Sequence, residues 1–153
     1  MKKNSRVKLK QDSLPFKKPV SDRIDIFIDG AARGNPGESG IGVLIKEEGG
    51  REREVKKYLG TRTNNQAEYT ALITALESAQ NHKNQEIRIF TDSLLLANQM
   101  NGIWKVRHPE IKELYMRAKG LIEGFSRVTI RHIPREENRE ADRLANLAID
   151  EYL

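Results

Sequence analysis

Two aspartates that share a local sequence pattern are the first candidates for chemistry. The segments Phe27-Ile28-Asp29 and Phe90-Thr91-Asp92 each place a phenylalanine two residues before an aspartate. Both segments close short apolar stretches typical of strands, and residues two apart point to the same face of a strand. If the two strands are parallel neighbours, their carboxylates lie side by side at the carboxyl ends of the strands, where open α/β sheets bind ligands.

Two further carboxylates fall on the apolar side of expected helices. Glu68 precedes Leu72 by four residues and Asp142 precedes Ala145 by three, so each should face the protein interior. An unpaired carboxylate in that position is costly or takes up a proton. Four such groups in one place repel one another unless divalent cations neutralise them. Hard oxygen ligands without sulfur select Mg²⁺ or Mn²⁺.

Each acid also has a plainer interpretation when it is taken alone. An aspartate at the end of a strand is usually a turn former or a helix cap. Glu68 could be a first-turn residue favoured by the helix dipole. Asp142 could be the salt-bridge partner of Arg139 or Arg143. Only the combination of the four acids indicates a metal centre.

The elements that must position these acids follow from the periodicity of the apolar residues. Glycine-rich segments at 34–37 and 49–50 indicate turns between strands, and residues 63–65 supply N-cap chemistry for a helix. The order β-β-β-α-β-α-α-β-α predicts an α/β (α+β) fold with a five-stranded mixed sheet flanked by helices. We expect strands at 24–29, 40–47, 51–59, 87–91 and 126–133, and helices at 64–80, 94–100, 109–123 and 136–152.

Composition limits the class of protein. A chain of 153 residues suffices for one domain with a hydrophobic core. The chain has no cysteine, which excludes disulfides, thiolate metal sites and cysteine nucleophiles. No apolar run approaches the ~20 residues of a membrane span, and no secretory signal is evident. We therefore expect a cytoplasmic protein without a membrane partner.

The net charge of +5 is unevenly distributed along the chain. Residues 1–23 carry a net charge of +6 and residues 24–153 a net charge of −1. The first segment is polar and basic, without sustained periodicity, so we expect a weakly ordered arm at 1–23 and one domain at 24–153. The arm could add sequence-independent affinity for phosphates, or it could be a solvated extension.

The motifs around the four acids resemble those of the type 1 ribonuclease H family across nearly all of 24–153. They stand in the order of that family. The matching segments are Asp29-Gly30-Ala31 with Gly34-Asn35-Pro36-Gly37, then Thr63-Asn64-Asn65-Gln66-Ala67-Glu68, then Thr91-Asp92-Ser93, and last His132 with Glu137-Asn138 and Ala141-Asp142-Arg143-Leu144-Ala145.

The resemblance implies a two-metal endonuclease that cuts the RNA strand of RNA–DNA hybrids, with a role in removing RNA primers or hybrids during replication and repair. Asp29 would bridge two Mg²⁺ ions, with Mn²⁺ as a possible substitute. Asp142 would complete one metal site, and Glu68 with Asp92 the other. One ion would activate the attacking water and the second would stabilise the leaving 3′ oxygen, giving 5′-phosphate and 3′-hydroxyl ends.

The resemblance also implies substrate contacts. The 2′-hydroxyl distinguishes RNA from DNA, and the implied contacts to hybrid are made by Asn35, Thr63, Asn64, Asn65, Gly30 and Ser93. Residues 35–37 also make a good turn, and residues 63–65 also cap a helix, so both roles can hold together. His132 matches a mobile histidine that assists proton transfer or product release; alternatively it is a solvated loop residue. His82 and His108 have no match and are expected at the surface.

Two departures from the family pattern concern substrate binding. Leu94 stands where better-known bacterial members carry a glutamine, which removes one polar contact. Those members also carry a long basic insertion, whereas residues 101–110 are short here. Trp104 lies among cations in that segment, so it could touch the DNA strand or pack against the core.

Two other classes of protein remain as alternatives. A binding module on the same fold would hold hybrid or structured RNA without cutting it, but such relatives lack part of the acid set. A transposase-like or 3′–5′ exonuclease relative would have different acid spacings. We expect a monomer that binds RNA–DNA hybrid.

Overall fold

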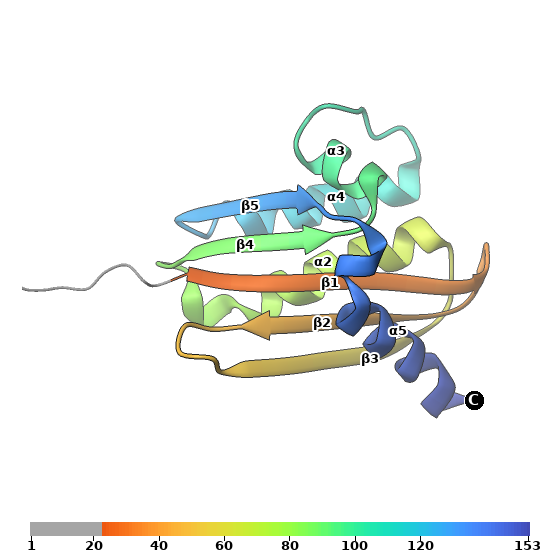
Figure 1. The fold of residues 1–153 in the computed structure, drawn as a ribbon. Helices are drawn as coiled ribbons and strands as arrows, with labels where there is room; N and C mark the ends of the chain where they lie inside the picture. The colour runs from red at the N-terminus through yellow and green to blue at the C-terminus, as the bar shows by residue number, and fades with distance from the viewer. Residues whose placement is uncertain (1–22) are drawn as a thin grey trace, which may run out of the picture.

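A five-stranded mixed sheet runs through residues 23–153, the part of the chain that the computed structural model describes (Figure 1). The strand order is β3-β2-β1-β4-β5. The first three strands pair antiparallel, and β4 and β5 extend the sheet in parallel with β1. The strands are β1 (Arg23–Gly34), β2 (Gly37–Lys46), β3 (Glu52–Arg62), β4 (Glu86–Thr91) and β5 (Arg127–His132). Except for Arg23, the arm expected at 1–23 lies outside the described residues.

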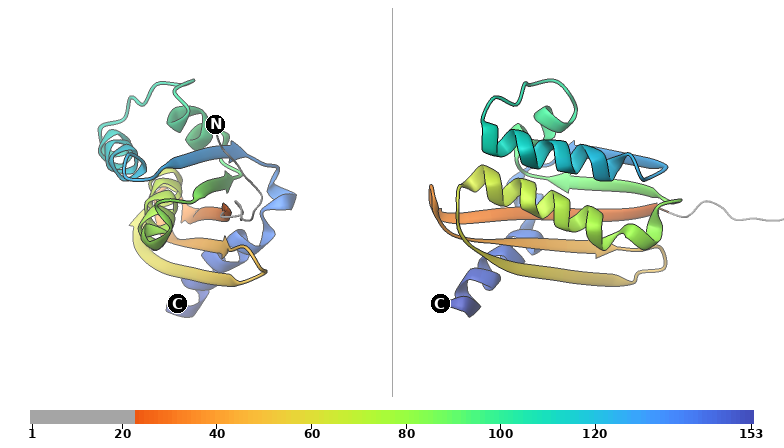
Figure 2. Two further views of the ribbon diagram at one scale, coloured as in Figure 1. Left: turned by 90° about the vertical axis from the view of Figure 1, so that its left-hand side faces the viewer. Right: turned by 180° about the vertical axis from the view of Figure 1, so that it is seen from behind.

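Helices cover both faces of the sheet. Helices α2 and α4 lie along one face and α5 crosses the other, as the opposite views of Figures 1 and 2 show. This arrangement confirms the predicted fold class and element order. The helices are α2 (Asn64–Ser78), α3 (Leu94–Met100), α4 (Pro109–Ile122) and α5 (Arg139–Tyr152), with 3₁₀ turns η2 (Gln80–His82) and η3 (Arg135–Glu137).

The first three strands are longer than predicted. Strand β1 was expected at 24–29 but pairs with β2 as far as Gly34 opposite Gly37. The second half of β1 consists mainly of glycine and alanine, so the apolar alternation that reveals a strand stops at Asp29 although the hydrogen-bonded ladder does not. Asp29 therefore lies in the middle of β1, and the prediction that it ends the strand was wrong.

The two phenylalanine–aspartate segments nevertheless lie side by side in the sheet, as their shared pattern suggested. Phe27 pairs in register with Phe90, and their rings stack with centroids 4.9 Å apart. The parallel pairing stops at Ile28 opposite Thr91. From Asp29 onward, β1 runs past the end of β4, and this leaves room beside it for other side chains.

Two glycines allow the helices that carry acids to approach the sheet. A Cβ on Gly30 would lie 2.3 Å from the carbonyl carbon of Ala67 on α2, and a Cβ on Gly42 would lie 2.2 Å from the carbonyl oxygen of Ala141 on α5. Both distances are too short for any side chain. Each contact lies one residue before an acid, so these glycines fix how close Glu68 and Asp142 come to β1 and β2.

The apolar core lies between the sheet and helices α2 and α4. Ile24, Ile26 and Ile28 on β1 are buried against Leu72 and Leu76 on α2. Alternate residues of β1 thus face the core, and the residues between them, including Asp29, face the side of α5. No helix among the described residues is long and apolar enough to cross a membrane.

Two helix ends and one histidine differ from expectation. The helix expected to reach residue 80 ends at Ser78 and continues as η2, and the last helix begins at Arg139 rather than 136 because η3 precedes it. His82 is not a free surface residue. Its ring is partly buried, with Nε2 3.2 Å from Glu47 Oε2 on the β2–β3 hairpin.

Candidate active site

The four acids come from four different elements and line one cavity. Asp29 projects from β1, Glu68 from the second turn of α2, Asp92 from the bend after β4, and Asp142 from the first turn of α5. The cavity is open to solvent and has a volume of about 400 Å³. Its other lining residues are Gly30, Ala31, Ala32, Arg33, Asn64, Ser93, Arg135 and Asn146.

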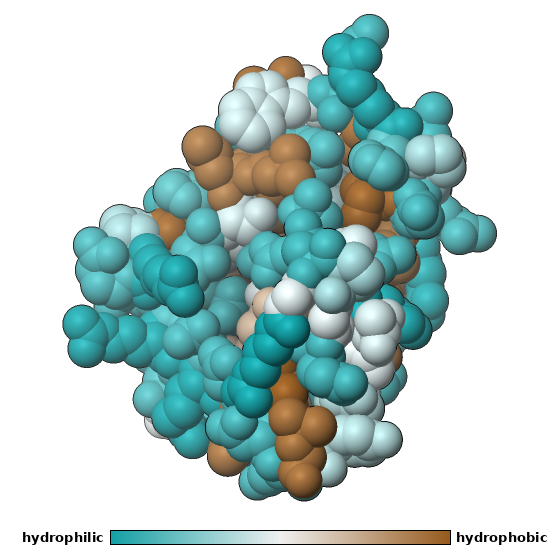
Figure 3. Space-filling view, turned by 90° about the vertical axis from the view of Figure 1, so that its right-hand side faces the viewer, coloured by the Kyte–Doolittle hydropathy of each residue, from teal (hydrophilic) through white to brown (hydrophobic). Residues whose placement is uncertain are grey.

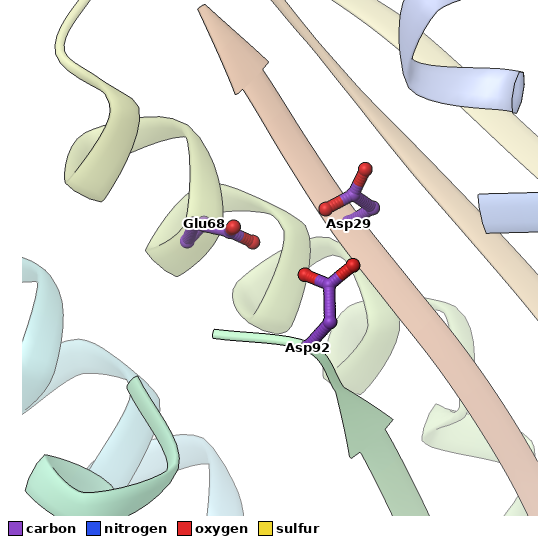
Figure 4. A group of neighbouring side chains, drawn as sticks. All are labelled: Asp29, Glu68 and Asp92. Carbon is purple, nitrogen blue, oxygen red and sulfur yellow. The ribbon is translucent and has the colours of Figure 1, made fainter. Parts of the chain in front are cut away.

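Three of the acids are close enough to share one ion. Asp29, Glu68 and Asp92 each place a carboxylate oxygen within 4.8 Å of the other two. Figure 4 shows these three side chains converging from β1, α2 and the end of β4. Asp142 lies outside this group of three but is near enough to Asp29 to help raise the pKa of that carboxyl group.

The backbone of β1 holds Glu68 in place. The Gly30 amide donates a hydrogen bond of 3.0 Å to Glu68 Oε1. Glu68 is only 5% exposed although it carries a carboxylate. This contact exists because α2 lies against the bare backbone of Gly30, so the side chain of Glu68 reaches the space beside β1.

Asn138 connects three of the acid-bearing elements. This residue is buried at the start of α5, and its Nδ2 donates a 2.9 Å hydrogen bond to the carbonyl of Ile28 on β1. Burial raises the pKa of Asp92, and the Asn138 side chain lies near enough to that carboxyl group to offset part of the rise. The Asn138 carbonyl accepts from the Asp142 amide at 3.1 Å. The buried Asn138 thus links the start of α5 to β1 and lies beside Asp92.

Burial and mutual repulsion make this cluster hard to ionise. Burial, and then the neighbouring Glu68 and Asp92, hold the pKa of Asp29 well above its ordinary value. Burial is also the largest cause of the raised pKa of Glu68, which the Gly30 hydrogen bond and Arg135 partly offset. The pKa of Asp92 is raised by burial as well. Ionised together, these groups need added positive charge.

The residues present fit a divalent metal ion. The donor set consists of carboxylate oxygens, which Mg²⁺ and Mn²⁺ prefer. Arg135 and Arg33 are the two basic side chains that line the cavity within the described chain, and Arg33 forms a 2.8 Å ion pair with Asp150. The excess of negative charge therefore matches a site for hard cations.

His132 and Ser93 lie near the cluster. His132 is the last residue of β5, is exposed, and is near enough to Asp92 to offset a small part of the rise that burial causes in the pKa of that carboxyl group. It does not line the cavity itself. Ser93 lines the cavity and caps α3 by accepting a 3.1 Å hydrogen bond from the Leu96 amide.

The other residues expected to contact substrate gather at the start of α2. Thr63 and Gln66 form a reciprocal cap, in which the backbone amide of Gln66 donates a 3.1 Å hydrogen bond to Thr63 Oγ1. The backbone amide of Asn64 donates a 3.0 Å hydrogen bond to Asn35 Oδ1, and this bond joins the β1–β2 turn to the helix. Asn64 lines the acid cavity, whereas Asn35, Thr63 and Asn65 line a neighbouring depression.

The start of α3 and the segment after it present apolar side chains to solvent. Leu94, Ile103 and Trp104 are 48%, 66% and 44% exposed, so the alternative that Trp104 packs in the core was wrong. The amides of Ile103 and Trp104 both donate to the carbonyl of Asn98, which places this segment against α3. Figure 3 shows apolar side chains at the surface in the upper part of the molecule, where α3 lies.

Sequence reasoning missed several residues around the acids. Asn138 lies in a matched motif, but its role in linking α5 to β1 depends on its burial, which residue spacing does not reveal. Asn146 follows Asp142 by four residues, and this spacing could have suggested a contact between them. Arg33 and Arg135 reach the cavity from a hairpin and a 3₁₀ turn, which carry no comparable signal.

Comparison with known proteins gives consistent matches. A family model described as "Reverse transcriptase-like" matches residues 27–148. A "Ribonuclease HI" of Halobacterium salinarum is 42% identical over 130 residues, which cover 84% of this chain and 65% of that protein. The chain thus spans slightly less than two thirds of this relative. A "Ribonuclease H" of Pseudomonas syringae is 35% identical, with 86% of this chain and 95% of that protein covered.

The fold and the sequence also match a solved structure. LC11-RNase H1, solved in complex with RNA/DNA hybrid, superimposes with a TM-score of 0.80. It is 43% identical in sequence, and the match covers 84% of this chain and 98% of that chain.

Proposed function

Because the chain belongs to the type 1 ribonuclease H family, we propose that it hydrolyses the RNA strand of RNA–DNA hybrids at internal positions. The products have 5′-phosphate and 3′-hydroxyl ends. The observation that carries this proposal is the convergence of Asp29, Glu68 and Asp92 within 4.8 Å, with Asp142 beside them. The complete acid set favours cutting over binding alone. The protein works as a cytoplasmic monomer that removes RNA primers or hybrids during replication and repair.

The cofactor of this reaction is a pair of Mg²⁺ ions, for which Mn²⁺ can substitute. Asp29 contributes to both sites, Asp142 to one, and Glu68 with Asp92 to the other. When bound, the ions supply an activated water and neutralise the charge that develops on the phosphate. Their positive charge would oppose the effects of burial and mutual repulsion on these pKa values, so the carboxyl groups would act as anions.

The protein positions the acids before substrate arrives. Glu68 is held by the Gly30 amide and Asp92 lies beside the buried side chain of Asn138, so little ordering of these two acids remains for the reaction. Preorganised charge of this kind lowers the barrier because little reorganisation remains. His132 stands exposed beside Asp92, where it can exchange a proton with solvent and assist product release.

Recognition of the RNA strand uses polar groups on both sides of the acids. Asn35 in the β1–β2 turn and Asn64 and Asn65 at the start of α2 supply side-chain amides, and Thr63 orders this helix end through its cap. Helix N-termini favour phosphates, and side-chain amides can bond to 2′-hydroxyl groups. Gly30 and Ser93 contact the RNA beside the cavity.

The DNA strand passes over the exposed segment after α3. Trp104 and Ile103 offer an apolar surface that suits deoxyribose, which lacks the 2′-hydroxyl group. Lys105 and Arg107 follow in the sequence and add positive charge for phosphates. Leu94, the first residue of α3, is also exposed, in place of the polar contact that a glutamine would make.

A cleavage assay on five labelled nucleic acids tests the proposal. The substrates are one RNA–DNA hybrid, duplex RNA, duplex DNA and the two single strands, each incubated with Mg²⁺ or with EDTA. We expect internal cuts in the RNA of the hybrid, in the presence of Mg²⁺ only. Binding of hybrid without cuts would support the binding-module alternative, and cuts proceeding inward from a 3′ end would support an exonuclease.

A further inference from the structure

Asn146 lies one helical turn after Asp142 on α5, and its side chain contacts that acid. Asn146 Nδ2 donates to the Asp142 carbonyl at 3.0 Å and to Asp142 Oδ1 at 3.3 Å. Both residues line the acid cavity and both are partly buried. The amide therefore engages one of the two carboxylate oxygens of Asp142.

Arg33 fixes which way the Asn146 amide faces. Arg33 Nη2 lies 3.2 Å from Asn146 Oδ1 and 3.2 Å from the Asn146 carbonyl oxygen. A guanidinium group can only donate hydrogen bonds, so the amide oxygen must face Arg33. The NH₂ group must then face Asp142, where it meets an acceptor. A 2.8 Å ion pair between Arg33 Nη1 and Asp150 holds the arginine in turn.

This network joins the two elements that carry Asp29 and Asp142. Arg33 follows Asp29 by four residues on β1, and Asn146 follows Asp142 by four residues on α5. Asp142 differs from Glu68 in the group that donates a hydrogen bond to its carboxylate. Glu68 accepts a hydrogen bond from the backbone amide of Gly30, whereas Asp142 accepts one from a side chain, that of Asn146.

We propose that Arg33 and Asn146 are positioning residues, which orient the Asp142 carboxylate toward a divalent cation in the cavity. The inference rests on the proposed function, because it assigns Asp142 to a metal site. Hydrogen-bond partners of a ligating carboxylate fix its rotamer and its free oxygen before the ion arrives. Without the amide, Asp142 on the rim of the cavity would have to be ordered by the ion itself.

The variant Asn146→Leu tests the inference, since it nearly preserves volume and removes the amide. We expect Mn²⁺ affinity, measured by isothermal titration calorimetry on the full chain without substrate, to fall roughly 10- to 100-fold. The KM for hybrid at saturating metal should stay unchanged, as should the Tm in EDTA. Arg143→Leu is the matched control, because Arg143 is exposed on the same helix and pairs with Glu140 and Glu54. Its metal affinity should equal that of the wild type.

Arg33→Lys provides a second variant with a gentler change. Lysine can keep the ion pair with Asp150 but has a single nitrogen, whereas Arg33 contacts Asp150 through Nη1 and both oxygens of Asn146 through Nη2. We expect a smaller loss of metal affinity in the same direction.

Two results would overturn the inference. Wild-type metal affinity in both Asn146→Leu and Arg33→Lys would exclude a positioning role, and so would an increased KM for hybrid at unchanged metal affinity, which marks a substrate contact. In either case the wild type still binds metal, so the proposed function stands. If the wild type itself binds no divalent ion, the proposed function fails together with the inference.

Discussion

At the scale of single residues, the chain places carboxyl groups where burial opposes their ionisation. Asp29 and Glu68 are each 5% exposed, yet their oxygens approach those of Asp92 within 4.8 Å. Isolated burial of like charges is unfavourable. The arrangement is explained if cations complete it, and this explanation makes two predictions about the acids.

The first prediction concerns activity. Asp29→Asn and Asp92→Asn preserve shape and remove charge, so we expect a folded protein whose kcat falls by several orders of magnitude. The measurement is hybrid cleavage under single-turnover conditions, with circular dichroism to check folding. Near-full activity in both variants would refute the assignment of the site.

The second prediction concerns stability and pH without metal. The pKa values of Asp29, Glu68 and Asp92 are raised in the folded state, so the folded protein holds protons that the unfolded chain releases. The stability contributed by these protons is complete below the ordinary carboxyl pKa and is lost as pH rises through the raised values. We therefore expect the Tm in EDTA to fall between about pH 5 and about pH 8.

Mg²⁺ should then raise the Tm more at the higher pH, because it binds the ionised cluster. Asp29→Asn, which removes one of the repelling charges, should flatten the dependence on pH. An equal effect of Mg²⁺ at both values of pH would contradict the electrostatic explanation.

At the scale of elements, the sequence predicted which segments are strands and helices better than where they end. The bounds of α3 were predicted correctly, because a serine cap precedes a clear apolar stripe. The second half of β1 was missed, because glycine and alanine carry no apolar alternation. The start of α5 was missed because a buried Asn138 holds the chain out of helical geometry, with φ −119°.

The site was predictable only in part for the same reason. Asp29, Glu68, Asp92 and Asp142 stand out by residue type and by their place on apolar faces. Their supports do not, because Gly30, Asn138 and Arg33 act through close approach and burial. Such properties depend on how the elements pack together and leave little trace in local spacing.

The packing of α2 on β1 gives a prediction at this scale. Gly30→Ala would place a Cβ 2.3 Å from the backbone of Ala67, so α2 must move away from the strand. We expect a loss of about 1–3 kcal/mol or more in the free energy of unfolding, measured with urea, together with reduced activity.

Gly120→Ala is the matched control for this change. Gly120 lies within α4, and a Cβ there meets nothing within 4 Å. It should stabilise the protein by about 0.5–1 kcal/mol, because alanine favours the helix. If Gly30→Ala did not lower the free energy of unfolding, close approach of α2 would not be what positions Glu68.

At the scale of the whole molecule, charge is divided between the N-terminal segment and the remainder. Residues 1–23 carry +6 and the remaining chain −1, so we expect the former to contribute electrostatic affinity for nucleic acid. Deleting residues 1–22 should weaken hybrid binding at low salt and reduce the slope of log K against log salt, by roughly 0.7–0.9 per lost phosphate contact. Fluorescence anisotropy with labelled hybrid in EDTA measures the slope. A slope identical to that of the full chain would assign hybrid affinity to residues 23–153 alone.

The claim on which the rest depends is that cations hold these acids together. Anomalous diffraction from crystals soaked in Mn²⁺ tests it most directly, because the signal locates the metal without reference to activity. We predict an anomalous peak in the cavity, at roughly 2.0–2.3 Å from oxygens of Asp29 and at least one other of the four acids. Saturating Mn²⁺ with no peak in that cavity would contradict the account.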